Sequence, residues 1–586
     1  MNQKKYDSNF SNSYFDPSGM INDWAVDQKT ITSWVNLNGA NMIFVPVIDN
    51  DISHNHFFCS QCKKWFTIHN STKNIKRHAK IHIPELVSEK DMNKNENSFF
   101  TKEQEKYINE KIISFIIFGT QTFQYVENFY LKSLSSSLPN RNKITKILEK
   151  VCNLTIEEIK SKLIYSSSNS LTFDEWSSKS NVPYLGITVR SFINLEYHDF
   201  FLDLIEINSE TASSSNLAIE VRKSLEKYNI DTESIVSVTT DNCSTMISTC
   251  DILNLFRIPC VCHLLNLIFK EFVEKISTII NPFFELVSFL TRSNKYTIFV
   301  NNQKIKKVPS YTNVRWTSFC KTVLILLETK EHILSFCLRE NREVPNESEW
   351  KKLSLLKRLC EQYVDIVKFF EADQFGASGY FLLYIDIIRD KFIELKKPVF
   401  QQGAKCARNK IKELQKKHSN FWNTIAPAAL LLNPSLPYNN LLTPNEVSQA
   451  KSFIIGKMKK YEVKQTKSQN QYPEYMKKYY ENIETIQKAP LQKILDERNL
   501  NLSTETLKKF WFEKIDTNEK SLALVAIDIL GAVITSVASE RSFSRGRLVV
   551  NEQRTRISSD HANQQMIVQL NSEIAQDAIS RTNIFH

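Results

Sequence analysis

Four short runs between residues 166 and 241 limit the possible folds of this chain more than any other feature. Each run is rich in β-branched and aromatic residues, as expected for a strand. A fifth run, SSNLAIEVRKSLEKYNI, has the periodicity of an amphipathic helix and separates the third strand from the fourth. The four strand-like runs are SLTFDEW, YLGITVRSFI, HDFFLDLIEI and SIVSVTTD.

This order predicts a mixed sheet. Three strands joined by short links form an antiparallel unit, and the helix then carries the chain to a fourth strand beside the first. Such a beginning is typical of an RNase H-like α/β domain. Residues 101–165 and 276–520 instead have helical periodicity almost throughout, and the polar stretch at 84–100 is a predicted linker.

The charge of the chain favours a polyanionic partner. The 586 residues carry a net charge of +11, and the basic residues gather in two places. Residues 59–82 hold six lysines and arginines without an acidic residue, and residues 541–556 hold five arginines against Glu552. Such patches are typical of nucleic-acid binding. No stretch approaches the roughly 20 apolar residues of a membrane helix, so we expect no membrane partner.

The first basic patch also has the spacing of a zinc site, C-x2-C-x15-H-x3-H. Two closely spaced thiolates and two imidazoles one helical turn apart can close a tetrahedral, structural zinc site. Chance clustering and a protein-binding zinc module are the alternatives. The predicted ligands are Cys59, Cys62, His78 and His82, and the candidate DNA contacts are Lys73, Lys76 and Arg77.

Two aspartates end neighbouring strands of the predicted sheet. Asp174 lies in the first strand run and Asp241 directly follows the fourth. Carboxylates this close repel one another unless a divalent cation such as Mg²⁺ or Mn²⁺ lies between them. Glu540 in SVASERSFSRGR is a third candidate. Spacing alone leaves the alternatives open that Asp174 caps a turn or pairs with a lysine, and that Glu540 pairs with a nearby arginine.

Five islands resemble the hAT (hobo/Activator/Tam3) superfamily of transposases, and the zinc module resembles a BED-type finger. The islands are LTFDEWSS, VTTDNCSTM, PCVCHLLNL, TNVRWTSF and SERSFSRGR followed by RTRI. The resemblance implies the fold class α/β plus all-α: an RNase H-like catalytic core interrupted by a long α-helical insertion, with a small N-terminal zinc finger. It also implies that Asp174, Asp241 and Glu540 form a DDE triad.

The implied organisation has five parts along the chain. They are the BED-type zinc finger at 25–85, a helical dimerisation or DNA-binding unit at 100–165, the first part of the core at 166–275, the helical insertion at 276–520, and the last part of the core with a C-terminal dimerisation region at 521–586.

Two further motifs acquire roles from the resemblance. Cys260 and His263 match the family's C-x-x-H element, for which a second zinc site is the alternative to supporting or DNA-end contacts. Arg315 and Trp316 match its RW motif, and Trp can stack on an unpaired base while Arg grips phosphate. A buried core Trp is the alternative there.

The predicted function is cut-and-paste DNA transposition in the nucleus. The chain would bind the terminal inverted repeats of its element as a homodimer or higher homo-oligomer, with structural Zn and catalytic Mg or Mn. DNA cleavage, hairpin formation on the flanking DNA and strand transfer would follow. A non-enzymatic DNA-binding regulator derived from a transposase is the main alternative, and an RNase H-type nuclease is the third.

Overall fold

The computed structural model of this chain describes three N-terminal strands and most of residues 101–582. The described residues between 101 and 582 have gaps at 120, 129–130, 133–134, 136, 179–180, 209–211, 311–315, 467–490, 496–501 and 551–556. The chain divides into two compact units, Met1–Thr101 and Lys102–His586. Within the described part, no helix has the length and apolar character needed to cross a membrane.

The N-terminal unit contains an antiparallel sheet of three strands, in the order β1-β2-β3. The strands are β1 (Phe44–Asp49), β2 (Ile52–Cys59) and β3 (Trp65–Thr67). The predicted zinc ligand Cys59 is therefore the last residue of β2. The other predicted ligands and the candidate DNA contacts of this unit lie outside the described residues.

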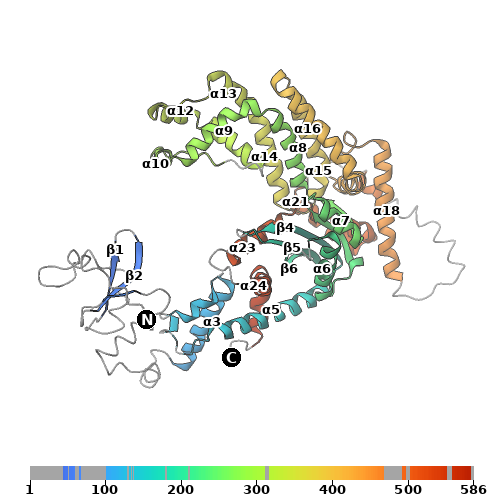
Figure 1. Ribbon diagram of the computed structural model, residues 1–586. Coiled ribbons are helices and arrows are strands. Elements are labelled where there is room, and N and C mark those ends of the chain that lie inside the picture. Colours follow the sequence, from blue (N-terminus) through green and yellow to red (C-terminus); the bar gives the residue numbers. More distant parts are fainter. Residues whose placement is uncertain are drawn as a thin grey trace. The chain divides into compact units, whose positions relative to one another are not determined.

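The second unit is built around a five-stranded mixed sheet in the order β6-β5-β4-β7-β8 (Figure 1). As the sequence predicts, β4 lies between an antiparallel neighbour, β5, and a parallel neighbour, β7. The short strand β8 was not predicted. The strands are β4 (Ser168–Ser177), β5 (Pro183–Ile193), β6 (Glu196–Glu206), β7 (Ile235–Thr240) and β8 (Arg257–Pro259).

Helices from both ends of this unit pack on the sheet. The predicted helix between the third and fourth strands is α6 (Ser214–Lys227), which begins where the Ser213 hydroxyl accepts a hydrogen bond from the Asn216 N–H at 3.2 Å. Such an N-cap satisfies a backbone donor that would otherwise lack a partner. The other helices of this part are α3 (Lys102–Phe118), α5 (Arg141–Leu163), α7 (Ser244–Leu253), α23 (Val537–Val549), α24 (Ser559–Leu570) and α25 (Ser572–Ser580).

Every described element between residues 261 and 530 is helical, and we call this stretch the helical segment. Its side chains build a hydrophobic core separate from that of the sheet. The helices are α8 (Val261–Lys275), α9 (Ser277–Arg292), α10 (Asn294–Gln303), α11 (Trp316–Glu328), α12 (Lys330–Arg339), α13 (Glu347–Ser354), α14 (Lys357–Glu371), α15 (Phe381–Glu394), α16 (Pro398–Lys417), α17 (Ala426–Leu431), α18 (Pro444–Thr466), α21 (Thr504–Glu513) and α22 (Lys520–Leu530).

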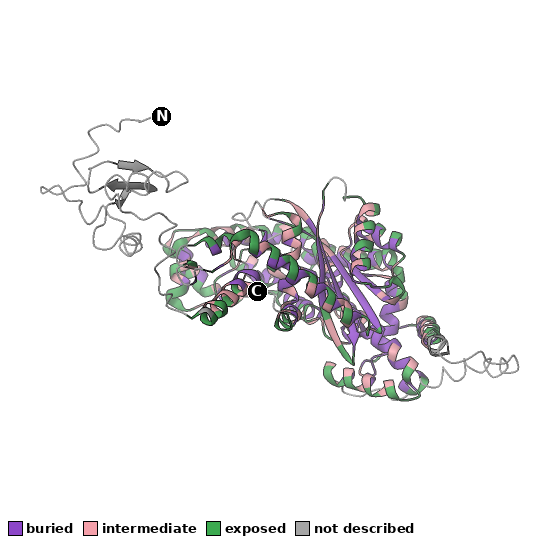
Figure 2. Cartoon of the chain, turned by 90° about the horizontal axis from the view of Figure 1, so that it is seen from below, coloured by how far each residue is buried: buried purple, intermediate pink, exposed green. Residues whose placement is uncertain are grey.

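After the helical segment the chain returns to the sheet. The Val533 N–H donates to the Ser170 hydroxyl of β4 at 3.2 Å, and the Val533 carbonyl accepts a hydrogen bond from the Thr239 hydroxyl of β7. One residue later, the Ile534 carbonyl accepts from the Val261 N–H at 2.9 Å. Residues more than 270 positions apart in the sequence therefore meet beside β4 and β7. Figure 2 shows that the strands of this sheet are largely buried.

Candidate active site

The sheet register brings the two predicted aspartates to the same edge. In the parallel pair β4 and β7, Thr172 lies opposite Thr239. Asp174 and Asp241 each lie two residues further along, just where β7 has ended. The carboxyl ends of parallel strands meet at one edge of a sheet, where α/β domains commonly place ligand-binding side chains.

Asp174 is partly buried, whereas its neighbour Glu175 is exposed. Successive side chains of a strand point to opposite faces of the sheet, so Asp174 shares a face with Thr172 and Trp176. That is the face to which the returning chain binds through Ser170. The charge in the middle of this apolar strand therefore points toward the C-terminal part of the protein.

Helix α23 brings Glu540 to this face, because its apolar side packs tightly on β4 and β5. The Phe543 ring stacks on Trp176 with centroids 5.9 Å apart and an angle of 15° between the rings. Phe543 also occupies the space above Gly186, where an added Cβ would lie 2.6 Å from the ring. Gly186 pairs with Asp174 across the two strands. Glu540 lies in the first turn of α23, one turn before Phe543.

The three carboxylates influence one another electrostatically. Burial, together with the smaller effects of the Asp241 and Glu540 charges, raises the pKa of Asp174 to about 7. A hydrogen bond with the Ser536 side chain and one from the Glu175 N–H, at 2.9 Å, act in the opposite direction. Asp174 therefore lies where negative charge is unfavourable in the protein alone, and among the described residues no lysine or arginine forms a salt bridge with it.

Cys260 connects the ends of the elements that carry these acids. Its N–H donates to the Thr240 carbonyl at 2.9 Å, and its Sγ accepts from the Ser536 N–H at 3.3 Å. The thiol is only 3% exposed, and burial raises its pKa. This arrangement favours a supporting role for Cys260 over direct contact with DNA.

His263 lies one turn into α8 and is partly buried. Burial lowers its pKa, the Asp241 and Glu540 carboxylates raise it, and Arg257 and Lys417 lower it. His263 is therefore close enough to the acids for their charges to act on it. Of the predicted RW motif, Trp316 begins α11 but its side chain is outside the description, and Arg315 lies in the gap at 311–315.

The sequence did not reveal Arg257 and His418, which are also at this edge of the sheet. Arg257 opens β8, a strand of three residues that is too short for a periodic pattern. His418 ends α16, and its Nδ1 lies 3.4 Å from Arg257 Nη1. In the sequence, only its position three residues before Cys260 could have singled out Arg257. Nothing in the sequence linked His418 to Arg257.

The chemistry of the acids fits a hard divalent cation such as Mg²⁺, which binds oxygen ligands. The raised pKa of Asp174 has two causes, burial and neighbouring negative charge, and a bound cation would offset both. The carboxylates are not drawn into a closed chelate, because among the described residues no group of three His, Cys, Asp or Glu side chains has metal-binding geometry. A cation would have to draw them together.

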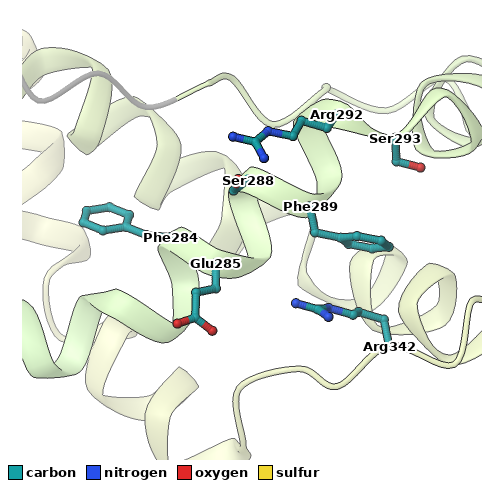
Figure 3. A pocket seen from close by; sticks show the side chains of 7 residues that line it. All are labelled: Phe284, Glu285, Ser288, Phe289, Arg292, Ser293 and Arg342. Carbon is teal, nitrogen blue, oxygen red and sulfur yellow. The ribbon is translucent and has the colours of Figure 1, made fainter.

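One hollow in the described part of the chain lies elsewhere, on the helical segment (Figure 3). It runs along α9, where Phe284, Glu285 and Phe289 line it. The Arg342 guanidinium lies over the Phe289 ring, 5.3 Å from its centroid. None of the candidate site residues lines this hollow.

Two parts of the chain match described families. Residues 172–258, which run from β4 to the middle of β8, match the ZBED1 RNase-like domain. Residues 490–572 match the hAT family C-terminal dimerisation region. The first range contains Asp174 and Asp241, and the second contains Glu540.

A maize (Zea mays) protein described as "Putative AC transposase" is 22% identical over 557 residues. The match covers 81% of this chain and 66% of that protein, just under two thirds of its length. The dimerisation region and this relative support a relationship to hAT transposases. They bear out the family resemblance in part, whereas the BED-type finger and the roles of individual residues stay predictions.

Proposed function

We propose that this chain is a DNA transposase that excises and inserts its element by metal-dependent phosphoryl transfer. The observation that carries the proposal is that the charges of Asp241 and Glu540, from distant parts of the sequence, act on Asp174 at one edge of an RNase-like sheet. The relationship to hAT transposases supports the choice of DNA as substrate.

In this proposal Asp174, Asp241 and Glu540 hold Mg²⁺ or Mn²⁺. Ions bound there would supply activation of a water or hydroxyl for attack and stabilisation of charge on the phosphate. The chain itself orients the ligands. The start of α23 holds Ser536 against Asp174, and the stacking of Phe543 on Trp176 fixes the helix that carries Glu540.

The same carboxylates would serve successive nucleophiles: water for the first strand cut, a DNA hydroxyl for a flanking hairpin, and the liberated 3′ hydroxyl for target joining. The N-terminal module, with its predicted structural zinc, and the basic surfaces would bind the terminal inverted repeats. The match to a dimerisation region supports a homodimer or higher homo-oligomer, and such an assembly would act in the nucleus.

The test is cleavage of labelled DNA that carries the inverted repeats bracketing the gene, with Mg²⁺ or Mn²⁺. The wild-type chain should give nicks, hairpins and joined products. Asp174→Ala should abolish cleavage, lowering the rate by at least about 1,000-fold, and should retain binding to the repeats. Asp251→Asn is the control, since Asp251 is an exposed carboxylate of α7 outside the site.

Retained cleavage in Asp174→Ala would contradict the assignment of the acids. Specific binding by the wild-type chain without any cleavage would instead support a DNA-binding regulator. Degradation of the RNA strand of a hybrid would support an RNase H-type nuclease.

A further inference from the structure

The side chain of Arg257 spans the end of β7 and binds three consecutive residues there. Its Nε donates to the Thr240 hydroxyl at 2.7 Å, and its Nη2 donates to the Asn242 side-chain oxygen at 2.8 Å. Nη2 also donates to the backbone carbonyl of Asp241. The guanidinium therefore contacts the candidate ligand Asp241 and both its neighbours.

Asp241 needs such support because it lies beyond the ladder of the sheet. Strand β7 ends at Thr240, and its pairing with β8 also ends there, opposite Pro259. The Asp241 carboxylate accepts a hydrogen bond from the Cys243 N–H at 3.2 Å, and its carbonyl also accepts one from the Thr240 hydroxyl at 2.9 Å. Arg257 thus adds the bonds that a neighbouring strand would supply inside the sheet.

Among the described residues, no carboxylate lies within salt-bridge distance of Arg257. Its side chain is partly buried, and burial lowers the pKa of the guanidinium. Burying an unpaired guanidinium is unfavourable unless its donors are satisfied. Here backbone and side-chain oxygens around Asp241 satisfy them, and the cation lies beside a cluster of carboxylates.

The fourth contact of Arg257 comes from the helical segment. Its Nη1 lies 3.4 Å from His418 Nδ1. Arginine can only donate hydrogen bonds, so Nδ1 of His418 accepts and the ring proton is on Nε2. His418 is only 6% exposed, and its Nε2 has no hydrogen-bond partner in the described part of the chain. His418 therefore limits the orientations open to the guanidinium.

We propose that Arg257 is a positioning residue that sets the backbone at Asp241 for metal binding, and that His418 orients Arg257. The inference rests on the proposed function for its consequence in catalysis. The structural part of the inference, that Arg257 holds residues 240–242 in place, does not depend on the proposed function. Removing a hydrogen-bond partner that orients a metal ligand typically lowers the metal affinity of the site by roughly 10- to 100-fold.

The first experiment measures amide hydrogen exchange of the full-length chain, which needs no activity. Arg257→Met should speed exchange in the peptide that covers residues 240–244 by about tenfold or more, and leave the β4–β5 hairpin unchanged. Arg257→Lys keeps the charge but lacks the fork that reaches several acceptors, so it should behave like the Met variant. Unchanged exchange in both variants would overturn the proposal.

The second experiment measures DNA cleavage against Mg²⁺ concentration. Both Arg257 variants should need roughly 10- to 100-fold more Mg²⁺ for half-maximal rate, with unchanged binding to the inverted repeats, under conditions where urea unfolding shows that both variants are fully folded. A fall in rate at every Mg²⁺ concentration, in proportion to lost folding, would mean a purely structural role. A Lys variant equal to wild type would show that charge suffices and would overturn the positioning role.

His418 provides a second route if the Arg257 variants fail to fold. His418→Asn can place an acceptor near the position of Nδ1 and should keep the wild-type Mg²⁺ dependence, whereas His418→Leu should shift it in the same direction as the Arg257 variants. Equal behaviour of Asn and Leu would overturn the role of His418. If the wild-type chain cleaves no DNA, the proposed function fails, and hydrogen exchange alone decides whether Arg257 holds Asp241.

Discussion

Replacing Asp174 by Asn should stabilise the metal-free protein at and above neutral pH. In the folded chain the pKa of Asp174 is about 7, against an ordinary value of 3.8, chiefly because of burial and the charge of Asp241. The folded state therefore binds more protons than the unfolded state between these two values, and stability falls as the pH rises through this window. Asparagine carries no charge, so Asp174→Asn does not lose this stability as the pH rises.

The size of the effect follows from the rise in pKa. One pKa unit corresponds to about 1.4 kcal/mol, so a rise of roughly three units sets a ceiling of about 4 kcal/mol. Asp174 is partly exposed, and solvent screening lowers the expected gain to about 2–3 kcal/mol. At about pH 5 only part of the pH range between the unfolded and folded pKa values has been crossed. The gain in stability of Asp174→Asn should therefore be less than half as large there.

Urea unfolding of the two proteins, followed by circular dichroism in Mg²⁺-free buffer, measures this difference. Asp174→Asn should be the more stable protein at about pH 8, with a smaller advantage at about pH 5. Added Mg²⁺ should stabilise the wild type but not the variant, because binding to the folded state adds stability that grows with the logarithm of the ratio of Mg²⁺ concentration to Kd. Mg²⁺ should therefore reduce the difference in stability between the wild type and Asp174→Asn.

The exposed carboxylate of Asp251 supplies the control. Asp251→Asn should change stability little at either pH, since its charge meets water rather than a buried site. A variant Asp174→Asn that is no more stable than wild type at about pH 8 without Mg²⁺ would refute the claim that Asp174 carries an uncompensated charge. The case for a cation at this position would then lose its electrostatic support.

Three further predictions concern the elements around the site. Gly186→Ala should lower stability by about 1–3 kcal/mol in urea unfolding, because the new Cβ would meet the Phe543 ring, and adding Phe543→Leu should restore part of that loss. Asp373→Ala should cost about 1–3 kcal/mol by the same measurement, since it removes a 2.6 Å ion pair with the buried Arg190; an unchanged midpoint would contradict this. Cys59→Ser should abolish zinc binding and weaken binding to the inverted repeats, as measured by zinc titration and gel shift, if the N-terminal module depends on its metal.

The strands and their order could be predicted from the sequence because local patterns determine them. Runs of β-branched residues mark β4 to β7, and the helix between β6 and β7 implies the parallel return beside β4. The position of Asp174 opposite the end of β7 then follows from the register. Strand β8 was missed because three residues, Arg257–Pro259, cannot show alternation.

The surroundings of the acids could not be predicted by the same means. The position of Glu540 depends on how α23 packs, and that depends on the missing side chain of Gly186 beneath Phe543. Glycine in a strand has several possible meanings, such as a bulge or a close approach of another element. Resemblance to a family, rather than spacing, selected Glu540 for the triad.

The position of the site between two hydrophobic cores explains why polar contacts decide its geometry. The core of the sheet ends at Leu253 and resumes at Phe543, while the core of the helical segment extends from Ile258 to Ile534. The chain therefore crosses between the cores twice, at 253–258 and at 534–543. Arg257 lies on the first crossing, and Ser536 and Glu540 lie on the second.

Apolar packing holds each core rigidly but does not by itself fix such crossings. Here hydrogen bonds bridge them, from Ser536 to Cys260, from Thr239 to Val533 and from Arg257 toward His418. Each such bond contributes only about 0.5–1.5 kcal/mol net. In the proposed mechanism, a cation would therefore draw the carboxylates together by rearranging a few polar contacts, without unpacking either core. This reconciles an acidic cluster that is electrostatically coupled with the lack of a closed chelate among the described residues.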